Sequence, residues 1–151
     1  MMAVDDLDLV RAYTFFDVRF FGALNAVHAA RPHLSSGAAI TLTSGSAASR
    51  PGAGWALGAS VSGAVSSLAK ALAVELAPIR VNAVAPGVLR SPIWSAMSEE
   101  RQAQFYASVA DALLVTRVGE VDDAAEAVLY CMTQTYTTGT VIGVDGGALL
   151  V

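Results

Sequence analysis

Apolar residues recur at helical spacing in a long first segment, from about residue 5 to residue 30. Asp5 and Asp6 can cap a helix there, and Arg31-Pro32 ends it, because proline disfavours a helical residue before it. The segment is apolar around nearly its whole circumference, which predicts a helix buried on nearly every side. Its apolar positions at helical spacing are Val10, Tyr13, Phe20, Leu24 and Val27.

A second long helix is predicted from about residue 55 to residue 77, ended by Pro78. Two shorter helices follow it. One begins after the N-cap Ser98, with acidic residues in its first turn, and the other begins at Asp122-Asp123 and runs to about Met132. The apolar stripe of the second long helix is Val61, Val65, Leu68, Leu72 and Leu76.

Three short, continuous apolar runs lie between these helices, at residues 38–43, 79–84 and 140–144. Each reads as a buried strand. A loop rich in Gly and Ser follows the first run, and Pro86-Gly87 breaks the chain just after the second. Strands that alternate with helices and are apolar throughout predict an α/β fold, with a parallel sheet covered by helices on both faces.

Composition narrows the classes of protein to which this chain can belong. The 151 residues are enough for one domain; 54% are hydrophobic, 15% are charged, and the net charge is −4. The acidic balance excludes the basic surface of a nucleic-acid binder, so no nucleic-acid partner is expected. No apolar run approaches the roughly 18 residues of a membrane helix, which predicts no membrane partner and a cytoplasmic location. The single cysteine, Cys131, lies in an apolar helix and is expected to be an inert buried thiol.

Four segments resemble the short-chain dehydrogenase/reductase family. They are Ala71–Gly87, Thr138–Gly147, Arg117–Asp123, and Gly37–Ser44, which is similar to the strand that delivers the catalytic serine. The resemblance covers the later half of a normal member and implies the later half of a doubly wound, Rossmann-like parallel sheet with flanking helices. Residues 1–151 are then a single incomplete domain that lacks the N-terminal nucleotide-binding part. NAD or NADP is therefore expected only if that part is present.

The resemblance also locates the family's catalytic positions, where a tyrosine phenol transfers a proton and a lysine four residues later lowers its pKa. The tyrosine position falls on Gly58 and the lysine position on Ser62, neither of which can do this chemistry. The position of the supporting asparagine falls on Arg19. Ser44 matches the catalytic serine, with Ser46 as a possible substitute.

A second candidate site is the loop Pro86-Gly87-Val88, with Ser91 where the family prefers threonine. In the family, the backbone of this loop faces the nicotinamide carboxamide, which implies cofactor contact. The alternative is that Pro-Gly simply ends a strand. Trp55 and Trp94 flank the presumed cleft, either as packing residues or as walls for a substrate.

No metal site is expected, because His28 and His33 have no Cys, Glu or second His at ligand spacing. A hydrolytic triad has no support either, since there is no Gly-x-Ser-x-Gly.

The sequence is therefore interpreted as an oxidoreductase of the short-chain dehydrogenase/reductase type by descent. The complete form would depend on NAD(P) and act on a small-molecule carbonyl or alcohol, and this chain would be catalytically impaired. The alternative is a non-enzymatic interaction or regulatory subunit that oligomerises through its long helices. A homo-oligomer is expected in either case, with close helix approach at the small residues Ala59, Gly63, Ser66 and Ser67.

Overall fold

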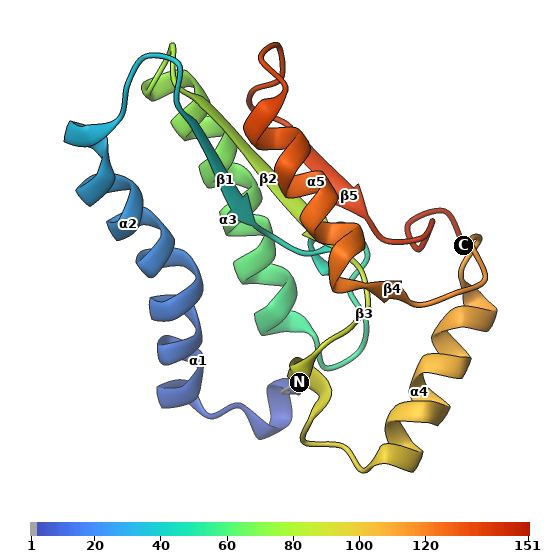
Figure 1. Cartoon of the computed structure of the whole chain (residues 1–151). Helices are drawn as coiled ribbons and strands as arrows, with labels where there is room; N and C mark the ends of the chain where they lie inside the picture. Colours follow the sequence, from blue (N-terminus) through green and yellow to red (C-terminus); the bar gives the residue numbers. More distant parts are fainter. Residues whose placement is uncertain (1–2) are drawn as a thin grey trace.

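The central sheet has three parallel strands in the order β1-β2-β5 (Figure 1). The computed structural model describes residues 3–151. The strands are β1 (Ala39–Thr43), β2 (Arg80–Pro86) and β5 (Val141–Val144). Residue 40 lies opposite residue 81 in the first pair, and residue 84 lies opposite residue 142 in the second. The predicted strands and their parallel arrangement are confirmed.

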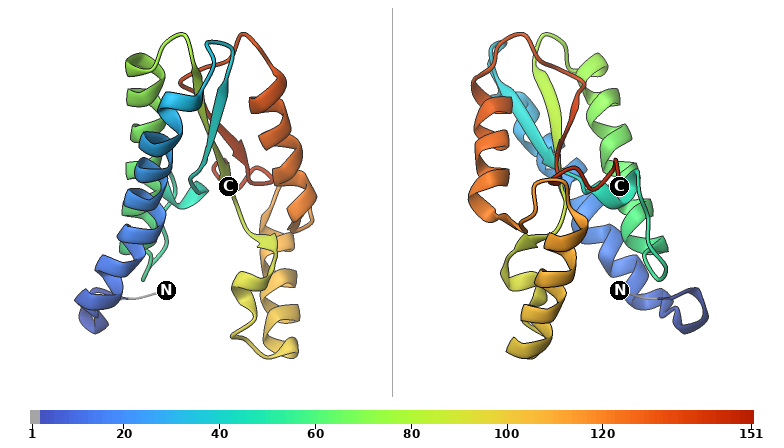
Figure 2. Two further views of the ribbon diagram at one scale, coloured as in Figure 1. Left: turned by 60° about the vertical axis from the view of Figure 1, so that its left-hand side comes forward. Right: turned by 90° about the vertical axis from the view of Figure 1, so that its right-hand side faces the viewer.

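Helices cover both faces of this sheet, as predicted (Figure 2). Helix α3 (Ala56–Glu75) packs against β1 and β2 on one face, and α5 (Val121–Thr133) packs against the same strands on the other. Helices α1 (Leu9–Phe16) and α2 (Gly22–Ala30) run beside α3. The fold is a helix–sheet–helix sandwich in which β2 is the central strand.

The first long helix is interrupted by a π-helical turn, Asp17–Phe21, between α1 and α2. The N-cap of α1 is Asp8, whose carboxylate accepts hydrogen bonds from the backbone amides of Val10 and Arg11. The prediction of Asp5 and Asp6 as caps is wrong, because these residues belong to a separate short 3-10 turn.

The predicted burial of this helix on nearly every side is also wrong. In the helical segments from residue 9 to residue 30, Val27 is the only buried residue, whereas Tyr13 and Val18 are 70% and 71% exposed. The helix packs with one face against α3 and the sheet, where Phe20 and Ala23 join Val27 in the core. No described element covers its other faces.

Helix α3 supplies much of the core, as its stripe predicted. Val61, Val65, Leu72 and Leu76 are buried, and Leu68 is partly buried. Complete burial of one such side chain stabilises the fold by roughly 1.5–3 kcal/mol. The core cluster of α2, α3, β1 and β2 comprises Val27, Leu42, Val65, Ala69, Leu72, Leu76, Ile79, Val81 and Ala83.

The same helix corrects one expectation from the sequence. With 20 residues and a mean hydropathy of 1.4 over its most apolar window, α3 is long and apolar enough to cross a membrane by length and composition. A single such helix is a weak indication, because the core helix of a soluble protein passes the same test. The buried side chains of α3 face the sheet and α2.

The starts of two further helices were predicted to within one residue. Helix α4 (Glu99–Ala112) begins after Ser98, whose hydroxyl accepts a hydrogen bond from the amide of Arg101. Helix α5 begins one residue before the predicted Asp122. A parallel pair of two-residue strands, β3 (Leu89–Arg90) and β4 (Gly119–Glu120), was not predicted, since two residues are too few to show a period.

Candidate functional site

Ligands of open parallel sheets bind beyond the carboxyl ends of the strands, and the candidate residues gather there. Ser44 follows β1 directly, and its amide donates to the carbonyl oxygen of Val84 over 2.8 Å. Gly87 follows β2, and its amide donates to the carbonyl oxygen of Val144 over 2.9 Å. A Cβ on Gly87 would lie 2.9 Å from the Cα of Asp145, so the close approach of the chain after β5 requires glycine here.

Ser44, the retained serine of the family pattern, is buried, and its hydroxyl makes two hydrogen bonds inside the fold. Only 3% of the surface of Ser44 is exposed. Its hydroxyl donates to the backbone carbonyl of Ser62 over 2.8 Å and lies 2.7 Å from the hydroxyl of Ser66. Since a hydroxyl has one proton, Ser66 must be the donor in the second bond. Ser44 therefore has no proton free for a ligand in this arrangement, and its catalytic role stays a prediction.

The positions of the family's tyrosine and lysine differ in how much room they offer. A Cβ placed on Gly58 would meet no heavy atom within 4 Å, so this position is open. Ser62 is buried, and its Oγ would lie 3.0 Å from a Cβ on Gly45. The structure places no phenol and no ammonium group at these two positions.

Arg19, at the position of the family's asparagine, lies on the π-helical turn and is half-buried. Its guanidinium carbon is 5.6 Å from the centre of the Phe15 ring, within the range of a cation–π interaction. The charge of Arg19 is therefore placed next to the Phe15 ring. That ring belongs to the wall of the cavity described next.

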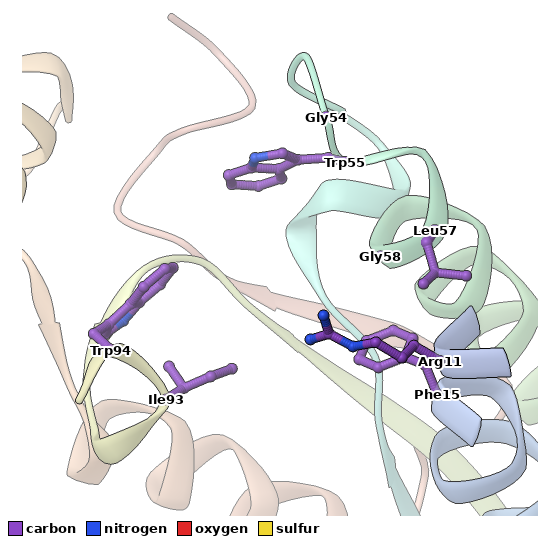
Figure 3. A pocket seen from close by; sticks show the side chains of 8 residues that line it. All are labelled: Arg11, Phe15, Gly54, Trp55, Leu57, Gly58, Ile93 and Trp94. Carbon is purple, nitrogen blue, oxygen red and sulfur yellow. The ribbon is translucent and has the colours of Figure 1, made fainter. Parts of the chain in front are cut away.

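A cavity of about 420 Å³ separates α1, the start of α3 and the 3-10 turn Pro92–Trp94 (Figure 3). Trp94 is fixed by a 2.9 Å hydrogen bond from its indole nitrogen to the carbonyl oxygen of Leu89, and its ring packs on Phe105 at 4.8 Å. The guanidinium of Arg11 points into the cavity. The lining residues are Arg11, Phe15, Gly54, Trp55, Leu57, Gly58, Ile93 and Trp94.

Sequence reasoning located only part of this wall. It placed Trp55 and Trp94 beside the presumed cleft and identified Gly58, and the structure brings all three to one cavity. It missed Arg11 and Ile93. A usable signal was present for Arg11, because Arg11, Phe15 and Arg19 follow one another at four-residue spacing and so share a helix face.

The residues predicted to contact a nicotinamide ring are only partly brought together. Gly87 and Val88 line a second hollow of about 490 Å³, which Ser46 and Trp55 also line. Pro86 is the last residue of β2. Ser91 is not among the lining residues of that hollow; its carbonyl accepts from the Trp94 amide at the start of the 3-10 turn.

The remaining candidates give no site. Within residues 3–151, no three His, Cys, Asp or Glu side chains are grouped so as to hold a metal ion. Cys131 is fully buried, and burial raises the pKa of its thiol, an effect that the nearby charge of Arg80 opposes. A thiol with a raised pKa is a poor nucleophile at neutral pH, as expected for an inert cysteine.

Comparison with known proteins agrees with this architecture. A family model described as the SDR-like Rossmann domain matches residues 2–151. The chain belongs to the short-chain dehydrogenase/reductase family. The solved structure of a small-chain dehydrogenase in complex with NADPH is 39% identical, superposes with a TM-score of 0.96, and is matched over 99% of this chain and 68% of that one.

Two further relatives bear on function. The short-chain dehydrogenase/reductase ucsE of Acremonium sp. is 40% identical over 95% of this chain and 56% of its own length. An NADPH-bound short chain oxidoreductase of Pseudomonas aeruginosa PAO1, described as containing an atypical catalytic center, is 28% identical with a TM-score of 0.87, over 97% of this chain and 60% of that one. The chain spans about half the length of the curated relatives it matches.

Proposed function

We propose that this chain forms the substrate-side half of an NAD(P)-linked oxidoreductase fold in which conventional carbonyl reduction is impaired. The observation that carries the proposal is the open cavity wall at Gly58, where the family has its proton-donating phenol. The ligand of the cavity is a small carbonyl compound or the corresponding alcohol.

Reduction of a carbonyl needs a hydride at carbon and a proton at oxygen. A phenol, whose pKa is ordinarily about 10, donates that proton efficiently only when a neighbouring cation lowers the value. Gly58 and Ser62 supply neither group. Ser44, the one retained hydroxyl, already donates its proton to the carbonyl of Ser62. Impaired proton transfer follows from these three positions.

The described residues fit one end of a dinucleotide better than the other. The hollow beside Gly87 and Val88 is large enough for a nicotinamide ring. A pyrophosphate requires a glycine turn between a strand and a helix N-terminus. In the part of the chain that the structure describes, β1 leads into a three-residue 3-10 turn, Ser46–Ala48, and β2 leads into β3. Binding of NAD or NADP, which would supply or accept the hydride, is therefore proposed only where a nucleotide-binding half is also present.

The proposal is tested by following nicotinamide absorbance with NADPH or NADH and a broad panel of aldehydes and ketones. The expected result is oxidation no faster than without protein. Steady oxidation that is abolished by Ser44→Ala, and not by the exposed control Ser36→Ala, would contradict the proposal.

A second candidate function, that of a non-enzymatic subunit, rests on exposed apolar surface. Val10, Tyr13 and Val18 are largely exposed on the first helix, and Val74 is 82% exposed on α3. Such surface commonly marks a contact with a partner. A homo-oligomer formed through these helices is proposed, and a cytoplasmic location stays a prediction.

The exposure of individual residues changes which face of α3 we expect to contact a second chain. Ser66 is bonded to Ser44 inside the fold, and Ala73 lies against the chain at Gly139, so neither faces outward freely. Ser67 is exposed, whereas Ala59 and Gly63 are half-buried. The outward stripe of α3 therefore contains Ser67 and Val74, seven residues apart.

A further inference from the structure

We propose that the cavity between α1, α3 and the Pro92–Trp94 turn selects an aromatic carbonyl compound that carries an anionic group, with Arg11 binding the anion. This inference rests on the proposed function, since it names the substrate class of the same cavity. It makes Arg11 a specificity-determining residue, which neither the family's catalytic positions nor the sequence patterns identified.

The body of the ligand is indicated by the walls. Apart from Arg11 and backbone, the cavity is lined by apolar and aromatic groups. Trp94 and Ile93 lie together on the 3-10 turn, and Trp55 and Leu57 lie on the opposite side at the start of α3 (Figure 3). Its volume of about 420 Å³ lies within the usual range of small-molecule sites. Trp94 is held by the Leu89 carbonyl and by Phe105, so this wall is preformed. A rigid aromatic wall favours a planar, apolar ligand.

Gly58 adds to the space for this body. A phenol at the position would extend into the cavity, since nothing lies within 4 Å of a Cβ placed there. With glycine, the volume next to α1 remains open to a ligand ring. Loss of the proton donor and gain of room are therefore two consequences of the same residue.

The charge of the ligand is indicated by Arg11. Among residues 3–151, both ion pairs lie elsewhere, Arg90 with Glu120 and Arg117 with Asp123, and no carboxylate lines the cavity. The neighbouring Asp8 directs an oxygen to the backbone amides of Val10 and Arg11. The guanidinium of Arg11 instead points between Phe15 and Ile93.

A guanidinium binds a carboxylate through two parallel hydrogen bonds. Arg11 is exposed, so its attraction for an anion is screened by salt. The guanidinium carbon of Arg19 lies 5.6 Å from the centre of the Phe15 ring, which places a second positive charge next to a residue of the wall. The lining therefore combines an aromatic box with one cation, which matches an aromatic keto acid better than a neutral ketone.

The test uses binding without cofactor. Trp55 and Trp94 are the only two tryptophans of the chain and both line the cavity, so intrinsic fluorescence reports on this site. The probes are 5-oxo-5-phenylpentanoate and its neutral methyl ester, titrated into the unmodified chain, Arg11→Met and Arg11→Lys. Arg31→Met, an exposed arginine at the end of α2, is the matched control.

The acid is expected to bind at least tenfold more tightly than the ester, and added salt is expected to weaken only the acid. Arg11→Met should remove that preference and leave the ester unchanged, Arg11→Lys should retain part of it, and Arg31→Met should change neither. Equal binding of acid and ester, an unchanged preference in Arg11→Met, or no binding of either probe would overturn the inference.

The outcomes separate this inference from the proposed function. Equal binding of both probes removes the role of Arg11 and leaves a carbonyl-binding cavity. NADPH-linked turnover of the keto acid, with the preference for the acid intact, would contradict the impairment and leave the role of Arg11 standing.

Discussion

The hydroxyl of Ser44 donates its proton to the backbone carbonyl of Ser62, 2.8 Å away. These are the positions at which the family has its catalytic serine and its lysine. One is retained but occupied in an internal hydrogen bond, and the other has lost its charge. The bond ties the end of β1 to α3 and is shielded from water, because both residues are buried. The hydrogen bond between Ser44 and Ser62 is therefore a structural contact inside the fold.

Restoring the lost pair is not expected to restore activity. A Cβ at Gly58 meets no heavy atom within 4 Å and the position opens onto the cavity, so Gly58→Tyr should be as stable as the unmodified chain. Adding Ser62→Lys buries an ammonium group at a position only 6% exposed, which should lower the free energy of unfolding by roughly 2 kcal/mol or more.

Urea denaturation measures the stability, and NADPH oxidation with an aryl ketone measures the activity. Ala103→Lys, at an exposed position on α4 outside the proposed contact stripe, is the control for introducing a lysine. Turnover in the double variant would show that the cofactor is oriented by a route absent from this account, since orientation supplies much of the barrier reduction.

Dinucleotide affinity of this chain is expected to be weak or undetectable. Among residues 3–151, the one strand that leads directly into a helix N-terminus is β4, into α5, and that helix start is capped by the carboxylates of Glu120 and Asp123, which disfavour a phosphate. Isothermal titration calorimetry with NADPH and NADH checks the prediction. Saturable binding at one molecule per chain with a low-micromolar dissociation constant would disprove it.

The start of α5 is expected to weaken in acid. Two hydrogen bonds from Arg117, of 2.7 and 2.8 Å, and one from the Glu120 amide hold the pKa of Asp123 well below its usual value. A lowered folded-state pKa stabilises the fold above the unfolded value of about 3.9, and this contribution is lost as the pH falls through the folded value.

Asp123→Asn should therefore lower the thermal midpoint most at neutral pH, and the difference from the unmodified chain should shrink in acid. Asp111→Asn, an exposed carboxylate on α4 without an ion pair among the described residues, is the control. A difference that does not depend on pH would contradict the role of the Asp123 charge.

A dimer formed through the long helices should be disrupted at the exposed stripe of α3. Ser67→Arg places a long charged side chain on this stripe without disturbing the core, since Ser67 is exposed. The expected result is at least a tenfold weaker dimer in sedimentation equilibrium. Ala103→Arg, on the exposed face of α4, should leave association unchanged. A folded monomer of the unmodified chain at micromolar concentration would refute the interface.

The sequence was sufficient for the elements that bury an unambiguous stripe or run. The strands and α3 were predicted because Val61, Val65 and Leu72 repeat at helical spacing between apolar runs. Burial of the first helix was not predictable in this way. An apolar pattern shows which side chains favour burial, but it does not show whether other described elements pack over them. Tyr13, for example, lies at a position that the apolar pattern predicts to be buried, but it is 70% exposed.

The residues of the candidate site also differ in how far the sequence predicted them. Alignment with family motifs located Gly58 and Ser62, whose local spacing on one helix is visible in the sequence. Arg11 lies 47 residues before Gly58 in the numbering, and the two line one cavity only because the π-helical turn Asp17–Phe21, which follows α1, packs against α3. The four-residue spacing of Arg11, Phe15 and Arg19 shows that they share a helix face. That this face meets Gly58 across a cavity depends on tertiary packing and is visible only in the structure.

The central claim, impaired carbonyl reduction, is tested most directly by tracing the hydride. The chain is incubated with 5-oxo-5-phenylpentanoate and NADPH that carries deuterium at either face of the nicotinamide C4, and the alcohol product is analysed by mass spectrometry. The account predicts no deuterated alcohol above the control without protein. Deuterated alcohol that increases with protein concentration and disappears in Ser44→Ala would contradict it.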